Sequence, residues 1–132
     1  MKALKEITVP VDIIKKYEIN LLIIFGSYVD GSNTDNSDLD LAYMSKILLG
    51  QKKELCLLED MVKHYRIGRL DLINLRKASP TLKYEVSTKG KLLYGTEIDF
   101  LKFQLYAAGR YADSYFLRKD REEYLKKRLS KL

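Results

Sequence analysis

Two aspartates separated by one residue, Asp38 and Asp40, are the side chains of this sequence best placed to do chemistry. The surrounding pattern predicts a strand over 38–44, and residues two apart on a strand point to the same side. Adjacent carboxylates repel each other, so each is driven towards protonation unless a cation lies between them. Hard oxygen ligands favour Mg²⁺, which takes its remaining ligands from water and from substrate phosphates.

A third aspartate, Asp71, interrupts the apolar stretch Leu70–Leu75. A lone carboxylate is costly in such a strand unless it is paired or bound to a metal. If this strand lies beside the 38–44 strand, the three carboxylates can hold two metal ions roughly 3.5–4 Å apart, which is the arrangement for in-line displacement at phosphorus. We therefore expect Asp38, Asp40 and Asp71 to bind two Mg²⁺ ions.

The pair Gly26-Ser27 ends a continuous apolar run and precedes Asp38 by ten residues. Glycine allows a sharp turn and a close approach of the backbone, so N–H groups and the Ser27 hydroxyl could cradle a triphosphate. A P-loop is excluded, because Ser32 stands where that motif needs lysine. A Gly-Ser turn alone, or an Asp-x-Asp strand end alone, is more often structural. In order on successive strands, with Asp71 on a third, they favour a catalytic site.

Hydrophobic spacing and turn residues predict the elements that must position these side chains. Ser79 is a plausible N-cap before Pro80, and Thr96 could cap the last helical segment. The expected elements are a helix over 11–17, a strand over 20–25, a loop over 30–37, a strand over 38–44, a helix over 45–65, a strand over 69–75, a helix over 79–87, an extended piece over 91–94 and helical structure from 96 onwards. This order predicts an α/β domain with a small sheet.

Helical spacing also predicts which side chains face the core. The single cysteine, Cys56, excludes an internal disulfide and is expected to be a reduced core thiol. Gly109 and the charged cluster 118–123 could divide the last segment into two helices. On the short helix over 11–17, Val11 and Ile14 are expected to face inward, with Ile13 as a further candidate. On the helix over 45–65 the apolar residues at helical spacing are Leu48, Leu55, Leu58, Met61 and Val62.

The chain length of 132 residues fits one domain, with a core over 1–95 and a C-terminal helical segment over 96–132. The net charge of +6 is concentrated in residues 101–132, which carry nine basic and four acidic side chains. This segment indicates an acidic partner, RNA or a negatively charged protein face, although a solvated helix face explains it equally well. No signal peptide or membrane-spanning run is present, so we expect a cytoplasmic protein that does not contact a membrane.

The spacing Gly-Ser-x10-Asp-x-Asp resembles the signature of the DNA polymerase beta-like nucleotidyltransferase superfamily, and the compact length resembles its minimal nucleotidyltransferase (MNT) branch. The tail is similar to the C-terminal helix of MNT antitoxins. The matching segments are the strand into Gly26-Ser27, the core Ser37–Leu41, the strand Leu70–Leu72, the stretch Lys89–Tyr94 and, in the tail, Tyr111–Ser114 with Arg118.

This resemblance implies a small mixed β-sheet flanked by helices, the polymerase beta-like fold, with a C-terminal helical extension. MNT antitoxins are encoded beside HEPN ribonuclease toxins, and the family implies that ATP and Mg²⁺ are used to transfer AMP onto a toxin tyrosine. Gly26 and Ser27 would then hold the phosphates and the three aspartates the metal. Asp71 is the candidate for helping to deprotonate the attacking hydroxyl.

The sequence departs from the family at two positions, because many members carry arginines where this chain has Tyr28 and Asp30. Lys46 or Arg69 could supply the missing cation. A non-catalytic antitoxin that blocks the toxin by binding is therefore an alternative. A small-molecule nucleotidyltransferase is a weaker one, since little chain follows the core. Direct nucleic-acid binding is not expected, and a homodimer and a hetero-oligomer with the toxin both stay open.

Overall fold

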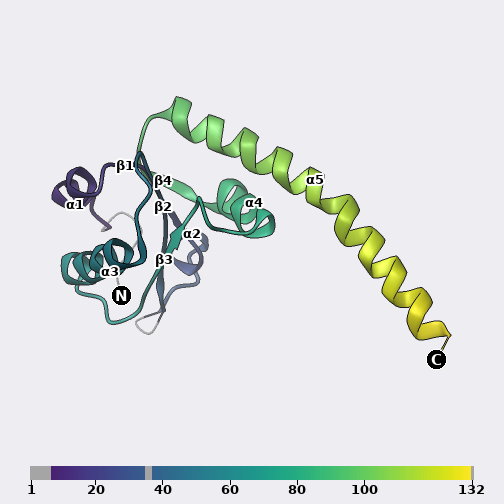
Figure 1. Ribbon diagram of the computed structural model, residues 1–132. Coiled ribbons are helices and arrows are strands. Elements are labelled where there is room, and N and C mark those ends of the chain that lie inside the picture. Colours follow the sequence, from purple (N-terminus) through teal and green to yellow (C-terminus); the bar gives the residue numbers. More distant parts are fainter. Residues whose placement is uncertain (1–6, 35–36, 132) are drawn as a thin grey trace.

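The computed structural model describes residues 7–34 and 37–131 and consists of a small sheet with helices on both faces and one long helix that leaves the body (Figure 1). The predicted loop positions 35 and 36, and the last residue, lie outside this part of the chain. The elements are α1 (Val11–Lys16), β1 (Ile19–Phe25), α2 (Ser27–Asp30), β2 (Leu39–Ser45), α3 (Gln51–Tyr65), β3 (Leu70–Asn74), α4 (Pro80–Lys89), β4 (Lys91–Tyr94) and α5 (Glu97–Ser130).

The sheet is mixed, with strand order β3-β2-β1-β4. β1 runs antiparallel to both of its neighbours, whereas β2 and β3 are parallel. A parallel pair needs a crossover connection, and α3 supplies it. β1 is covered on both faces: Leu22 and Ile24 belong to one core cluster, and Leu21 and Ile23 to the other. This double burial explains the continuous apolar run from which the strand was predicted.

Two apolar clusters lie on opposite faces of the sheet. The first, beneath α1 and α3, includes Ile14, Leu22, Ile24, Leu39, Leu41, Tyr43, Leu57 and Met61. The second, beneath α4 and α5, includes Leu21, Ile23, Ala42, Leu75, Val86, Phe103 and Ala107. Side chains alternate along β3, because Leu70 and Leu72 pack on the first cluster and Ile73 on the second.

Both predicted helix caps are confirmed. The Ser79 hydroxyl accepts a hydrogen bond of 3.2 Å from the Leu82 backbone N–H at the start of α4. The Thr96 hydroxyl accepts one of 3.0 Å from the Asp99 backbone N–H at the start of α5. Each bond satisfies a backbone donor that has no partner within the helix.

The prediction for residues 45–65 was wrong at its start. Ser45 still belongs to β2 and pairs with Ile19, and α3 begins only at Gln51. Two side chains predicted to face inward are exposed instead: Leu48, which precedes α3, is 75% exposed, and Leu55 is 58% exposed. The buried face of α3 is formed by Leu57, Met61 and Tyr65. Cys56 is exposed and is not a core thiol.

The first helix shows a similar error on a smaller scale. Its Ile14 is buried as expected, but Val11 is 53% exposed. Val11 occupies the first position of α1, directly after Pro10. The spacing of apolar residues therefore did not predict the exposure of Val11, which lies at the end of this six-residue helix.

The last segment forms one helix of 34 residues, α5, and Gly109 does not divide it. At a rise of 1.5 Å per residue, α5 is about 51 Å long. Its first half packs on α4 and β1, while its second half extends beyond the body (Figure 1). No helix in residues 7–34 and 37–131 combines the length and apolar character needed to cross a bilayer.

A matched pair of substitutions on α3 tests this arrangement. Leu57→Ala removes a fully buried side chain and should lower the free energy of unfolding by about 2–5 kcal/mol. Leu55→Ala truncates an exposed side chain on the same helix and should change it by less than about 0.5 kcal/mol. Urea unfolding of both variants measures the difference. A larger loss for Leu55→Ala would contradict the orientation of α3.

Candidate active site

The parallel pairing of β2 and β3 brings two of the predicted carboxylates side by side. Asp40 and Asp71 are register partners, and Asp38 immediately precedes β2. Along β2, Asp40 alternates with core residues of the α3 side, so it shares the face of Ala42 on the α4 side of the sheet. The two strands that carry Asp40 and Asp71 are thus neighbours in the sheet, as the predicted metal site requires.

Burial and like charge act together on Asp40. The pKa of its carboxyl rises from an ordinary value near 3.8 to about 6, first because the group is removed from water. The negative charges of Asp71 and Asp38 raise the pKa further, and so does a hydrogen bond with Asp71. Each of these effects disfavours the ionised form, as expected when carboxylates share a small volume.

The carboxylates lie near one another but do not form a preformed metal-binding site. Within the described residues, no group of three or more His, Cys, Asp or Glu side chains is arranged to hold one ion. Asp38 and Asp71 are exposed, whereas Asp40 is half-buried. The donor chemistry nevertheless fits Mg²⁺, since the three groups offer hard oxygen ligands and their mutual repulsion would be relieved by a divalent cation.

Gly26 lies directly against this cluster. Its φ of +77° falls in the left-handed region, and a Cβ built on it would lie 2.2 Å from Oδ2 of Asp40. Any other residue would strain the backbone and collide with the carboxylate. Phe25 pairs with Asp40 across β1 and β2, and Ser27 opens the short helix α2. The fold therefore places the Gly-Ser turn and the Asp-x-Asp strand in contact, as their order in the sequence suggested.

A cavity of about 490 Å³ opens beside Gly26. Its lining residues are Phe25, Gly26, Val29, Asp30, Glu85 and Lys89. Lys89 lies at the end of α4, where its ammonium group forms an exposed ion pair of 3.3 Å with Glu85. In the sequence, Lys89 begins one of the segments that resemble the family, and no pattern there indicates a role for its side chain.

The packing of α4 explains why Lys89 reaches this cavity. A Cβ on the next residue, Gly90, would lie 2.5 Å from the Ile23 side chain and 2.5 Å from the Val86 carbonyl oxygen. Gly90 thus lets the end of α4 approach β1 closely. The signal available in the sequence was this glycine between two lysines, Lys89 and Lys91.

The structure also explains the two departures from the family pattern. Tyr28 is 6% exposed and packs into the core beneath α1 and α3, so this position faces inward. Asp30 is exposed and accepts hydrogen bonds from the backbone N–H and hydroxyl of Ser32. Its pKa is lowered by these two bonds.

One of the two cations suggested as a replacement is in the wrong place. The backbone N–H of Lys46 bonds to the Glu18 carbonyl, at the end of β1 opposite Gly26. Arg69 directly precedes β3, and its carbonyl accepts a hydrogen bond from the Leu39 N–H at the carboxylate end of the sheet. Arg69 therefore stays a candidate, whereas Lys46 does not.

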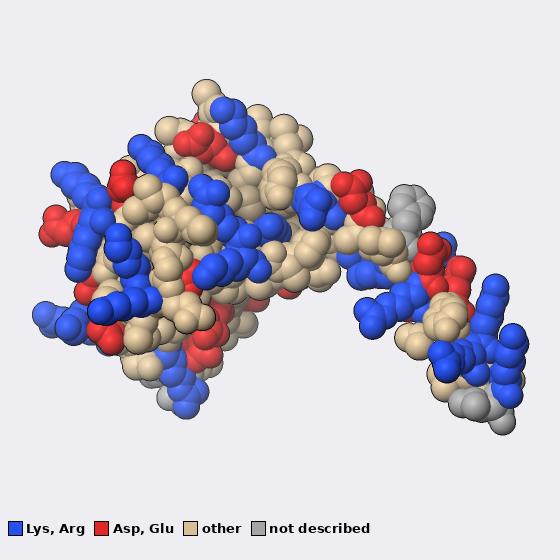
Figure 2. Space-filling model, in the orientation of Figure 1, with Lys and Arg blue, Asp and Glu red and all other residues tan. Residues whose placement is uncertain are grey.

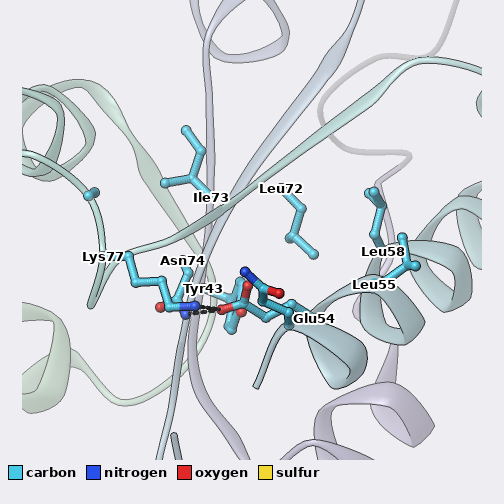
Figure 3. A pocket seen from close by; sticks show the side chains of 10 residues that line it. Tyr43, Glu54, Leu55, Leu58, Leu72, Ile73, Asn74 and Lys77 are labelled. Carbon is cyan, nitrogen blue, oxygen red and sulfur yellow. Dashed lines mark hydrogen bonds and ion pairs between the residues drawn. The ribbon is translucent and has the colours of Figure 1, made fainter. Parts of the chain in front are cut away.

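A second cavity, of about 520 Å³, lies between α3 and β3 (Figure 3). In it, Glu54 accepts a hydrogen bond of 2.7 Å from Asn74 and forms an ion pair of 2.8 Å with Lys77. Tyr43 lines this cavity and lies three positions after Asp40 on β2, so the two side chains lie on opposite faces of the sheet. The cavity is therefore separate from the carboxylates.

Carboxylates on two neighbouring strands beside a Gly-Ser turn form an arrangement suited to nucleotidyl transfer. The family model for Polymerase beta, Nucleotidyltransferase matches residues 11–99, and the chain belongs to this family. The matched region contains the five residues predicted for the site: Gly26, Ser27, Asp38, Asp40 and Asp71.

Individual relatives are consistent with this membership. The protein adenylyltransferase MntA of Shewanella oneidensis is 34% identical over 82 residues, which are 62% of this chain and 58% of the relative. A solved structure of a toxin–antitoxin with AMP-PNP superposes with a TM-score of 0.74 at 26% identity, covering 90% of this chain and 94% of the other.

A second solved structure, a tri-AMPylated Shewanella oneidensis HEPN toxin in complex with an MNT antitoxin, gives a TM-score of 0.68 at 24% identity. It covers 90% of this chain and 92% of the matched chain. At this identity the likeness concerns the fold alone. These comparisons confirm the predicted fold class and the resemblance to MNT proteins of toxin–antitoxin pairs.

The raised pKa of Asp40 predicts a pH-dependent stability with a definite sign. A carboxyl whose pKa rises on folding stabilises the fold below its unfolded value near 3.8, and that contribution is lost as the pH rises through about 6. In metal-free buffer, Asp40→Asn should therefore raise the free energy of unfolding at pH 7.5 by about 1–2 kcal/mol, a figure reduced for partial solvation.

Chemical denaturation at pH 4, 5, 6 and 7.5 measures this effect. Asp30→Asn is the matched control, because the pKa of Asp30 is lowered and its replacement should not stabilise the fold at pH 7.5. Equal stabilities of the wild type and Asp40→Asn at pH 7.5 would show that the ionised Asp40 carboxylate does not destabilise the fold.

Proposed function

We propose that this chain is an antitoxin nucleotidyltransferase, which transfers AMP from ATP to a tyrosine of a cognate HEPN ribonuclease toxin and thereby neutralises it. The observation that carries the proposal is the register of Asp40 with Asp71 beside Gly26, in a chain of the polymerase beta nucleotidyltransferase family. The adenylyltransferase relative and the AMP-PNP complex support ATP as the donor. The structure with an AMPylated HEPN toxin supports the choice of partner only through its likeness in fold.

Each site residue has a proposed role. Asp38, Asp40 and Asp71 would hold Mg²⁺, which when bound neutralises phosphate charge and orients the donor. Gly26 allows the backbone to approach the triphosphate, and the Ser27 hydroxyl donates to it. The cavity beside Gly26 would receive the nucleoside, with Phe25 and Val29 as apolar surfaces and the carboxylates of Asp30 and Glu85 as acceptors for hydroxyl or amino groups.

The transfer itself is a substitution at the α-phosphorus of ATP. The tyrosine hydroxyl oxygen forms the new P–O bond, and the bond between the α-phosphorus and the bridging oxygen breaks to release pyrophosphate. Asp71 accepts the hydroxyl proton, which it later returns to solvent. The surrounding side chains act by positioning, since a correctly held nucleophile and donor need only a weak base. The proposed setting is the cytoplasm, where ATP and the toxin's RNA substrates occur together.

A second candidate is an antitoxin that blocks the toxin by binding alone. The observation that favours it is the absence of the family arginines, because buried Tyr28 and exposed Asp30 offer no cation to the phosphates. In that case the carboxylates would be remnants of a catalytic ancestor. The two candidates differ in whether neutralisation needs nucleotide.

Substitution of the carboxylates tests the enzymatic proposal. Asp38→Asn, Asp40→Asn and Asp71→Asn should each lower AMP transfer from labelled ATP by roughly a hundredfold or more, because each removes a charged ligand that acts on the transferred phosphoryl group. Stabilisation of the fold by ATP should require Mg²⁺ and should be lost in the same variants. Asp113→Asn, on exposed α5, is the control and should retain both properties.

The intact mass of the toxin after incubation separates the two candidates. With ATP present, the wild type should leave the toxin heavier by whole AMP units, and the toxin should stay inactive after the antitoxin is removed. Inhibition of an unmodified toxin in the absence of nucleotide would favour blocking by binding and overturn the enzymatic proposal.

A further inference from the structure

The second half of α5 projects from the body as a charged arm, which we define as residues 117–131 (Figure 1). All side chains of residues 119–131 are exposed. The arm carries seven basic and three acidic residues, a net charge of +4. Figure 2 shows Lys and Arg side chains gathered over its far end, with acidic side chains nearer the body.

The arm also has an apolar stripe that nothing in the described chain covers. Leu117 is 73%, Tyr124 59%, Leu125 48% and Leu129 67% exposed. Their spacing of seven, eight and twelve residues from Leu117 puts them on one side of a helix with 3.6 residues per turn. Such a stripe on a helix that packs against nothing is typical of an interaction surface, because isolated helices of this length are only marginally stable in water.

The direction of the arm is set where α5 leaves the body. The ring of Tyr111 stacks on that of Tyr84 from α4, with centroids 4.2 Å apart and planes inclined by 12°. The Arg118 guanidinium lies 4.6 Å from the Tyr111 centroid on the same helix. The residue after Tyr84 is Glu85, which lines the cavity beside Gly26. One helix, α4, therefore both anchors the arm and forms a wall of the candidate nucleotide site.

Charge and shape select among the possible occupants of the stripe. A second copy would bring two arms of charge +4 together, and they would repel each other. RNA would satisfy the cations, but leucines neither stack on bases nor bind phosphates, and Asp120, Glu122 and Glu123 would repel the backbone. An acidic protein surface with an apolar floor matches both the leucines and the positive charge of the arm.

We propose that residues 117–131 are a docking arm that binds an acidic, apolar-floored face of the partner toxin, away from the tyrosine that is modified. The identity of this partner rests on the proposed function. Docking holds the toxin close to the active site, so the transfer to the tyrosine proceeds at a high effective concentration. Arg121 and Arg128 lie on the stripe between the leucines, and Arg128 donates a hydrogen bond of 3.1 Å to the Tyr124 hydroxyl. They are the cations expected to meet the toxin's carboxylates.

A pair of matched double variants tests the arm. Arg121→Glu/Arg128→Glu reverses two charges on the stripe, and Lys119→Glu/Lys126→Glu makes the same change in net charge two residues earlier, about 200° around the helix. The probe is a purified HEPN toxin, the partner named in the proposed function. Its affinity without ATP, and the KM and kcat of AMP transfer to it, are measured for the wild type and both variants.

The stripe variant should bind the toxin at least about tenfold more weakly and raise KM by a similar factor with kcat unchanged, whereas the control should lose less than about threefold. Transfer to a short peptide that contains the acceptor tyrosine should be equal in all three proteins, since a peptide cannot reach the arm. Circular dichroism should show the same helix content in each.

Several outcomes would overturn the docking arm. Equal losses in the two variants would mean that net charge alone acts, and unchanged affinity in both would mean that the toxin binds elsewhere. Self-association of the wild type that the stripe variant loses in sedimentation would assign the stripe to a second copy. Loss of binding to a single-stranded RNA, with toxin affinity unchanged, would assign it to RNA.

Failure of the proposed function gives a different result. If the wild type transfers no AMP to toxin or peptide, the enzymatic proposal fails. The docking arm still stands in that case if the stripe variant alone loses affinity for the toxin, because the binding measurement contains no nucleotide.

Discussion

Mutual repulsion between neighbouring carboxylates is the constraint on which the site depends. Asp40 faces Asp71 across β2 and β3, and burial together with these charges raises the pKa of Asp40 to about 6. Selection for stability alone would not keep this pair, because removing one of two like charges lowers their repulsion and stabilises the fold. The two aspartates are neighbours because β2 and β3 are parallel, and a parallel pair needs a crossover connection. Helix α3 is that connection, and it also covers one of the two apolar clusters.

The opposite strand neighbour adds a steric constraint to the electrostatic one. β1 brings Gly26 so close to Asp40 that a Cβ would lie 2.2 Å from its carboxylate oxygen. The cavity beside Gly26 lies next to this contact, and the oxygen donors of the carboxylates suit Mg²⁺. Tyr28, which follows the Gly-Ser turn, packs its side chain into the core beneath α1 and α3. Lys89, from α4, lines the cavity beside Gly26, and Arg69 directly precedes β3 at the carboxylate end of the sheet.

Helix α4 connects the features that the function requires. Gly90 lets its end pack tightly on β1, which brings Lys89 to the cavity beside Gly26. Tyr84 on the same helix stacks on Tyr111 and orients α5. The same helix thus contacts both α5 and the cavity beside Gly26.

Local patterns in the sequence determined the strands, the caps at Ser79 and Thr96, and the candidate site, because these depend on neighbours a few residues apart. Only the tertiary structure decided that β2 lies beside β3, that Lys46 is at the wrong end of β1 and that Lys89 reaches the cavity. It also turned Leu57, Met61 and Tyr65 of α3 towards the core, which leaves Leu55 and Cys56 exposed, and made α5 one helix. These outcomes depend on pairing and packing between segments far apart in the chain, which no local periodicity records.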